Sequence, residues 1–111
     1  MQIFRLNDLV TEGRNQRWQE FLRASSLSMG FYRLKAGQAD EQRSHAEDEV
    51  YLVVSGKASF RADGQERTVA PGTVIFVERS VEHRFFDITE DLTVLVFFAP
   101  PEGSLSNGAD K

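Results

Sequence analysis

The sequence contains no cysteine, only two histidines and no long apolar run. The absence of cysteine excludes disulfides, thiolate metal sites and a cysteine nucleophile. No apolar run approaches the roughly 18 residues that a membrane-spanning helix needs. The N-terminal stretch 1–16 also lacks the long apolar core of a secretory signal. We therefore expect a cytoplasmic protein with no membrane partner.

Positive charge is scarce as well. Lys and Arg total 13 against 17 Asp and Glu, which gives a net charge of −4 at pH 7. A nucleic-acid-binding domain would show clustered Lys and Arg on a basic chain, so we expect no nucleic-acid partner. No serine stands in a Gly-x-Ser-x-Gly context, which disfavours serine-hydrolase chemistry.

Strand-forming residues are plentiful, and they include nine phenylalanines among 111 residues. From residue 27 onward, short stretches rich in β-branched and aromatic residues are separated by turn signals about every 8–12 residues, which is typical of an all-β sandwich or barrel. Asp63-Gly64 predicts a two-residue hairpin, because a type I′ turn needs positive φ at both positions. The predicted strands are 27–34, 49–55, 57–62, 65–69, 73–77, 82–88 and 92–99.

The length suits a single domain, which we divide into three segments. Residues 1–26 are expected to pack on the barrel, 27–101 to form its core, and 102–111 to be a flexible tail. The first segment fits two structures, because Trp18 and Phe21 are at helical spacing while Trp18 and Leu22 also fit a strand alternation.

His45 and Glu49 stand where a strand begins, four residues apart. Four residues of strand span about 13 Å, whereas metal–ligand bonds are about 2 Å long. Both side chains reach one metal only if the backbone bends between them, and the stretch 46–48 is suited to such a bend. On this interpretation Glu47 and Asp48 are solvated bend residues.

The second histidine, His83, begins another predicted strand. With His45 and Glu49 it completes a set of two imidazoles and one carboxylate. Such a set holds non-haem Fe(II) with open positions, or zinc with one open position, and Mn and Ni also accept these ligands. The pattern predicts one divalent metal ion at His45, Glu49 and His83, and the alternative is a solvated, charged loop.

Two segments carry residues at family-like spacing. In the first, Gly37 is followed after five residues by Arg43, and then by His45, Glu49 and Gly56. The segment resembles the first motif of the cupin superfamily, which reads G, five residues, H-x-H, three or four residues, E, six residues, G. The run HAEDEVYLVVSGKASF also resembles small bacterial single-domain cupins with H-x-E-D-E-x-Y at this place.

The second segment resembles the second cupin motif, which reads G, five residues, P-x-G, two residues, H, three residues, N. Gly72 opens it, His83 stands at the His, and Glu78, Ser80 and Asp87 replace the Pro, Gly and Asn. The resemblance implies a cupin jelly-roll β-barrel in a single domain, with a metal in the barrel. It also implies a homodimer.

Arg43 is the main departure, because it stands where the family has its first histidine ligand and an arginine stays protonated. In one interpretation the metal remains on His45, Glu49 and His83, and Arg43 grips a carboxylate or phosphate of a small-molecule ligand. In the other, Arg43 pairs with Glu49 or Glu47 and the barrel binds an anion without metal.

Two further residues are candidate substrate contacts: Tyr51 shares strand parity with Glu49, and Phe85 shares it with His83. The alternative for both is core packing. Trp18 and Phe21 are expected to cover a barrel end or a dimer contact. Three functions stay open: a metal-dependent enzyme of oxygenase or isomerase type, a non-catalytic module that binds a small molecule or metal, and a metal-free anion-binding barrel.

Overall fold

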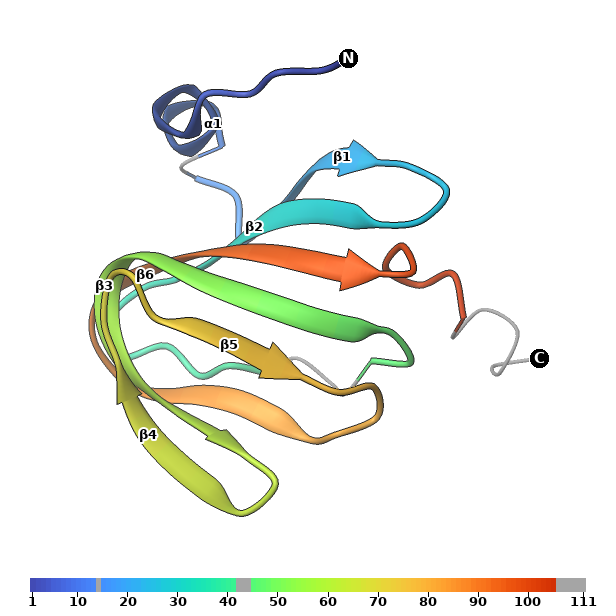
Figure 1. Cartoon of the computed structure of the whole chain (residues 1–111). Helices are drawn as coiled ribbons and strands as arrows, with labels where there is room; N and C mark the ends of the chain where they lie inside the picture. Colours follow the sequence, from blue (N-terminus) through green and yellow to red (C-terminus); the bar gives the residue numbers. More distant parts are fainter. Residues whose placement is uncertain (14, 42–44, 106–111) are drawn as a thin grey trace.

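The computed structural model describes residues 1–13, 15–41 and 45–105. It contains one short helix and six strands, which wrap into an antiparallel barrel (Figure 1). The elements are α1 (Leu6–Glu12), β1 (Trp18–Arg23), β2 (Ser28–Leu34), β3 (Asp48–Ala62), β4 (Gln65–Val69), β5 (Val74–Val77) and β6 (His83–Ala99).

Two long strands, β3 and β6, bend and so belong to both walls of the barrel (Figure 1). The first half of β3 pairs with β5 and with the second half of β6, which β2 and β1 extend. The second half of β3 pairs with β4 and with the first half of β6. All these pairings are antiparallel, which confirms the predicted all-β jelly-roll barrel.

The structure corrects the predicted strand list at the two bends. Residues 49–55 and 57–62 are one strand, β3, and residues 82–88 and 92–99 are one strand, β6. The register between them shifts three times from Val53 to Ser59, so bulges bend the strands without ending them. Gly56 lies at this bend with φ +94°, a conformation that suits glycine.

The two-residue hairpin at Asp63-Gly64 is confirmed. Asp63 has φ 51° and Gly64 has φ 73°, and Ala62 pairs directly with Gln65 across the turn. This turn fixes the register of β4 and therefore which of its residues face the barrel interior.

The main core fills the barrel with side chains from both walls. Its largest fully buried members are aromatic: Tyr51 packs edge to face with Phe60 and Phe85, at centroid distances of 5.7 and 5.3 Å. Several of the phenylalanines therefore fill the barrel interior, where aromatic rings bury a large apolar area.

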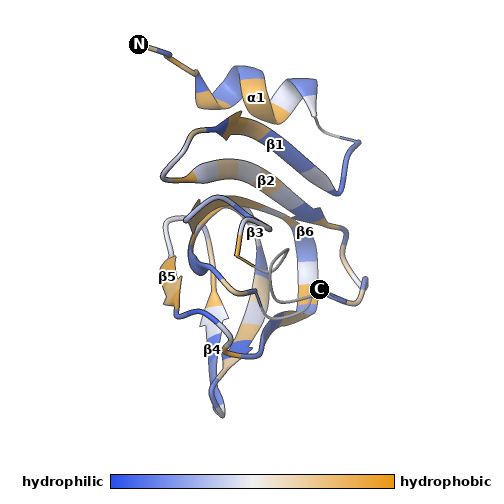
Figure 2. Ribbon diagram, turned by 90° about the vertical axis from the view of Figure 1, so that its right-hand side faces the viewer, coloured by the Kyte–Doolittle hydropathy of each residue, from blue (hydrophilic) through white to orange (hydrophobic). Residues whose placement is uncertain are grey.

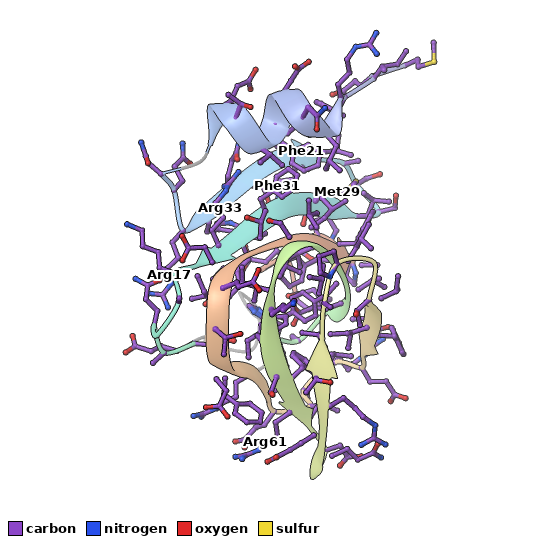
Figure 3. All side chains as sticks on the ribbon, turned by 90° about the vertical axis from the view of Figure 1, so that its left-hand side faces the viewer. Arg17, Phe21, Met29, Phe31, Arg33 and Arg61 are labelled. Carbon is purple, nitrogen blue, oxygen red and sulfur yellow. The ribbon has the colours of Figure 1, made fainter. Side chains whose placement is uncertain are left out.

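A second core lies outside the barrel, between α1 and the sheet (Figure 2). Leu9 from α1 packs with Phe31 and Leu95, and Phe21 stacks on Phe31 at 5.6 Å. Figure 3 shows Phe21, Met29 and Phe31 in this layer. The open question about the first segment is resolved as strand β1, whose Phe21 faces this layer, while α1 was not predicted.

Candidate functional site

The loop that follows β2 brings His45 to the barrel, and a buried carboxylate fixes this loop. Asp40 is 4% exposed; its Oδ1 accepts a hydrogen bond from the Tyr32 hydroxyl (2.7 Å) and its Oδ2 accepts one from the Phe85 N–H (2.8 Å). The loop is thereby tied to β2 and β6. Sequence reasoning missed Asp40, because a single acid in a polar loop carries no periodic signal.

The contact between Tyr32 and Asp40 has a consequence at alkaline pH. Burial and the Asp40 carboxylate raise the pKa of the Tyr32 hydroxyl far above its usual value. Because the pKa of Tyr32 is higher in the folded than in the unfolded state, its contribution to the free energy of unfolding is complete below about pH 10. This contribution decreases as the pH rises above that value. We expect urea unfolding from pH 9 to 11 to show this loss, and Tyr32→Phe to reduce it. An unchanged alkaline slope in the variant would refute this assignment.

The three predicted metal ligands converge inside the barrel. The Nε2 atom of His83 lies 3.3 Å from Oε1 of Glu49, and the Nε2 atom of His45 lies 3.9 Å from the same oxygen. His45 reaches this point because residues 46 and 47 form a bend before β3 begins at Asp48. The predicted bend between His45 and Glu49 is thus confirmed.

Glu49 is the most unusual group of the site. It is 1% exposed, and its Oε2 atom is buried without a hydrogen-bond partner among the described residues. A buried carboxylate oxygen without a partner is costly, so such an atom in a folded protein calls for an explanation such as an ion.

The hydrogen bonds of His83 orient its ring. Its Nδ1 lies 2.8 Å from the Val81 carbonyl oxygen, to which it donates, and its Nε2 lies 2.8 Å from the Tyr51 hydroxyl. Burial alone would lower the pKa of His83, but Glu49, the Val81 carbonyl and Asp40 together raise it. An Nδ1–H donor leaves Nε2 as the nitrogen that can bind a metal, which is the usual arrangement of ligand histidines.

The two residues that were predicted to be solvated, Glu47 and Asp48, differ in their exposure. Glu47 is 1% exposed, so the expectation that it is solvated is wrong. Its two carboxylate oxygens accept hydrogen bonds from the backbone N–H groups of Gly103 (3.1 Å) and Leu105 (3.0 Å). Asp48 is partly exposed and accepts from the Arg79 N–H at 2.8 Å. Glu47 therefore fixes the C-terminal segment to the barrel, including the start of the predicted flexible tail.

We expect Glu47→Gln to loosen this segment, because an amide nitrogen cannot accept a hydrogen bond and one backbone N–H loses its partner. The local stability falls by about 1–3 kcal/mol, which accelerates local hydrogen exchange roughly fivefold or more. The measurement compares the exchange of the Gly103 and Leu105 amides with that of the Val77 amide in the core. Equal acceleration at all three amides would instead indicate global destabilisation.

The other predicted contacts are placed as follows. Tyr51 is buried, and its hydroxyl lies at His83 rather than at the surface. Phe85 is 1% exposed and packs against Phe60 in the core at 4.7 Å between ring centroids. Arg43 lies outside the described residues. Ser80 and Asp87, at the Gly and Asn positions of the second motif, have φ values of 64° and 48°, in the left-handed region that Gly and Asn favour.

A pocket of about 170 Å³ opens beside His45. Phe98 joins the pocket to the ligand set, because its ring packs edge to face with that of His45 at 4.9 Å. The lining residues are Trp18, Tyr32, His45, Val96, Phe98 and Glu102.

The donor atoms of His45, Glu49 and His83 are of the types that bind metal ions, although their arrangement is not that of a formed metal centre. Within residues 1–13, 15–41 and 45–105, no group of three His, Cys, Asp or Glu side chains has the arrangement of a metal centre. Two imidazole nitrogens nevertheless face one carboxylate whose second oxygen has no partner there. The residues present therefore fit a divalent ion that prefers nitrogen and oxygen ligands.

Residues 30–98 match the Cupin domain family, which covers more than half of the chain. The chain belongs to the cupin family. This cupin is 45% identical to an uncharacterized protein of Streptomyces coelicolor over 104 residues. The aligned region covers 92% of this chain and 99% of the relative.

Solved structures agree with this assignment at the level of the fold. The protein TT1209 from Thermus thermophilus matches with a TM-score of 0.72 and 24% identity, over 91% of this chain and 99% of that chain. DMSP lyase DddQ from Ruegeria pomeroyi matches with a TM-score of 0.67 and 21% identity, over 80% of this chain and 48% of that chain. The predicted small single-domain cupin is thereby confirmed.

The described part of this cupin has no helix long and apolar enough to cross a membrane.

Proposed function

We propose that this cupin binds one divalent metal ion through His45, Glu49 and His83, and a small molecule in the adjoining pocket. The observation that carries the proposal is the buried Glu49 carboxylate, which two imidazole nitrogens face and whose second oxygen lacks a partner in the described part of the chain. A metal ion would satisfy this oxygen and neutralise the buried charge.

When bound, the metal would supply a Lewis acid toward an oxygen atom of the ligand. The residues of the chain itself orient the ligand histidine. Val81 holds the Nδ1–H of His83, so the ring presents Nε2 to the barrel interior. The Tyr51 hydroxyl lies 2.8 Å from the same Nε2 atom, so it is placed next to the position that the metal would take.

The predicted homodimer remains a prediction. One surface of the described part suits it: Val74 and Phe76 on β5 are 65% and 61% exposed. β5 pairs only with β3 among the described strands, so these two exposed side chains lie on an edge strand of the sheet.

The metal proposal is tested by the metal content of protein purified without chelator or added metal. We expect close to one equivalent of divalent metal per chain in the wild type, and a loss of about 100-fold or more in affinity in His45→Ala and His83→Ala. The matched control is Glu47→Gln, which alters an equally buried carboxylate outside the ligand set and should retain the metal. Substoichiometric metal that neither histidine substitution changes would overturn the proposal in favour of the metal-free anion-binding barrel.

A further inference from the structure

Aromatic rings form most of the pocket beside His45. Trp18 on β1 lies directly opposite Tyr32 on β2 in the strand register. The Trp18 ring meets that of Phe98 nearly at right angles, with an interplanar angle of 80° and a centroid distance of 6.0 Å. Rings from three neighbouring strands therefore turn toward one space, and Trp18 is still 36% exposed.

A glycine makes this arrangement possible. A Cβ atom at Gly30 would lie 2.5 Å from Cη2 of Trp18, so no larger residue fits beneath the indole ring in its present position. Gly30 thus leaves room for the Trp18 ring beside β2, where the ring lines the pocket.

The pocket also has an acidic wall, Glu102. Its backbone is fixed on both sides, because its N–H donates to the Ser28 hydroxyl (2.9 Å) and its carbonyl accepts from the Arg23 guanidinium (2.8 Å). The next residue, Gly103, is held by Glu47. Among the described residues no hydrogen bond or ion pair engages the Glu102 carboxylate, which is therefore available to a ligand in the pocket.

We propose that the pocket binds a small organic cation of the alkylammonium class, with Glu102 as the residue that selects for positive charge. The faces of Trp, Tyr and Phe rings attract cations, and aromatic cages are the common device for binding quaternary ammonium groups. Glu102, whose backbone is held in place, adds a negatively charged side chain to the pocket lining. The proposal deepens the proposed function, on which it rests only for the placement of this ligand beside the metal ligands.

The size of the pocket agrees with this ligand. An apolar cavity of about 150 Å³ holds one benzene molecule, and this pocket has about 170 Å³. A trimethylammonium head is of comparable bulk and leaves a short chain to extend toward His45.

The test compares three probes of nearly the same shape and different charge: choline, its neutral isostere 3,3-dimethylbutan-1-ol, and the anion 3,3-dimethylbutanoate. Trp18 is the single tryptophan of the chain, so its fluorescence reports on the pocket directly. We expect choline to bind about tenfold more tightly than the neutral isostere, and the anion to bind most weakly.

Variants assign this preference to its residues. Glu102→Gln should reduce the preference for choline over the isostere by about threefold, to the part that the rings contribute, with isostere binding unchanged. Glu90→Gln, an exposed carboxylate paired with Lys57 elsewhere on the barrel, is the matched control and should keep the ratio. Gly30→Ala, measured by calorimetry, should weaken choline binding because it displaces the Trp18 ring.

Each titration is carried out on metal-loaded and on metal-free protein, so that the two proposals fail independently. A preference for choline in metal-free protein supports the cation pocket even if no metal binds. Equal affinities for choline and the isostere would overturn the proposal and leave an apolar pocket. Tightest binding of 3,3-dimethylbutanoate to the metal-free protein would overturn it in favour of an anion anchor such as the one predicted for Arg43.

Discussion

Replacing Glu49 by leucine is expected to make the metal-free protein more stable while it abolishes metal binding. Glu49 is 1% exposed, and its Oε2 atom is buried without a partner among the described residues. Replacement of buried charged groups by apolar residues of similar volume is often neutral or stabilising, and removal of an unsatisfied buried oxygen recovers about 1–3 kcal/mol. We expect a gain of that size in the free energy of unfolding.

The measurement is urea unfolding in the presence of a chelator at pH 8, because replacing Glu49 removes one of the groups that raise the pKa of His83. Glu47→Leu is the matched control. Its carboxylate is equally buried, but both oxygens accept hydrogen bonds, so this variant should be less stable than the wild type. If Glu49→Leu is destabilised as much as Glu47→Leu, Glu49 has a structural role and the functional interpretation fails.

The second large effect is expected at Gly56, where β3 bends. A Cβ atom at this position would lie 2.2 Å from the carbonyl oxygen of Asp91 and 2.7 Å from Cα of Leu92. Both are backbone atoms of β6 and cannot move aside as a flexible side chain can. Backbone strain at φ +94° adds to the clash. Together they should cost Gly56→Ala roughly 3–5 kcal/mol, which is a large part of the stability of a small domain.

Thermal unfolding measures this cost, and we expect Tm to fall by more than about 10 °C. Gly72→Ala is the control, because Gly72 has nearly the same φ, +92°, but no atom lies within 4 Å of its missing Cβ. It should lose only about 1 kcal/mol from backbone strain. Equal losses in the two variants would show that the approach of β6 to Gly56 does not limit the bend.

Local signals in the sequence predicted much of this fold. Asp63-Gly64 gave the hairpin because a two-residue turn with positive φ depends only on its own residues. The convergence of His45, Glu49 and His83 was predicted from a bend between the first two and from the resemblance to the cupin motifs, and the bend is present at residues 46 and 47. The sequence did not predict that β3 and β6 are continuous, because Gly56 was interpreted as the end of a strand. The bulges that let the strands bend without ending depend on the pairing with partner strands, which is not visible in a local pattern.

Other features depend on long-range contacts that no local pattern reveals. Glu47 lies two residues from each of two predicted ligands, His45 and Glu49, yet its carboxylate accepts hydrogen bonds from backbone groups more than fifty residues later. Asp40 likewise bonds a tyrosine on β2 and a backbone N–H on β6. The pocket walls Trp18 and Glu102 come from opposite ends of the chain, so their meeting could not be read from spacing.

The central claim is that His45, Glu49 and His83 hold a divalent metal, and its most direct test is nitrogen NMR of histidine-labelled protein titrated with Zn²⁺. The chain has only two histidines, so the spectrum contains four ring nitrogens. We predict that one equivalent of Zn²⁺ shifts the Nε2 resonances of both rings, while the Nδ1 of His83 stays protonated on the Val81 carbonyl. Unchanged Nε2 resonances of both histidines after one equivalent would contradict the claim.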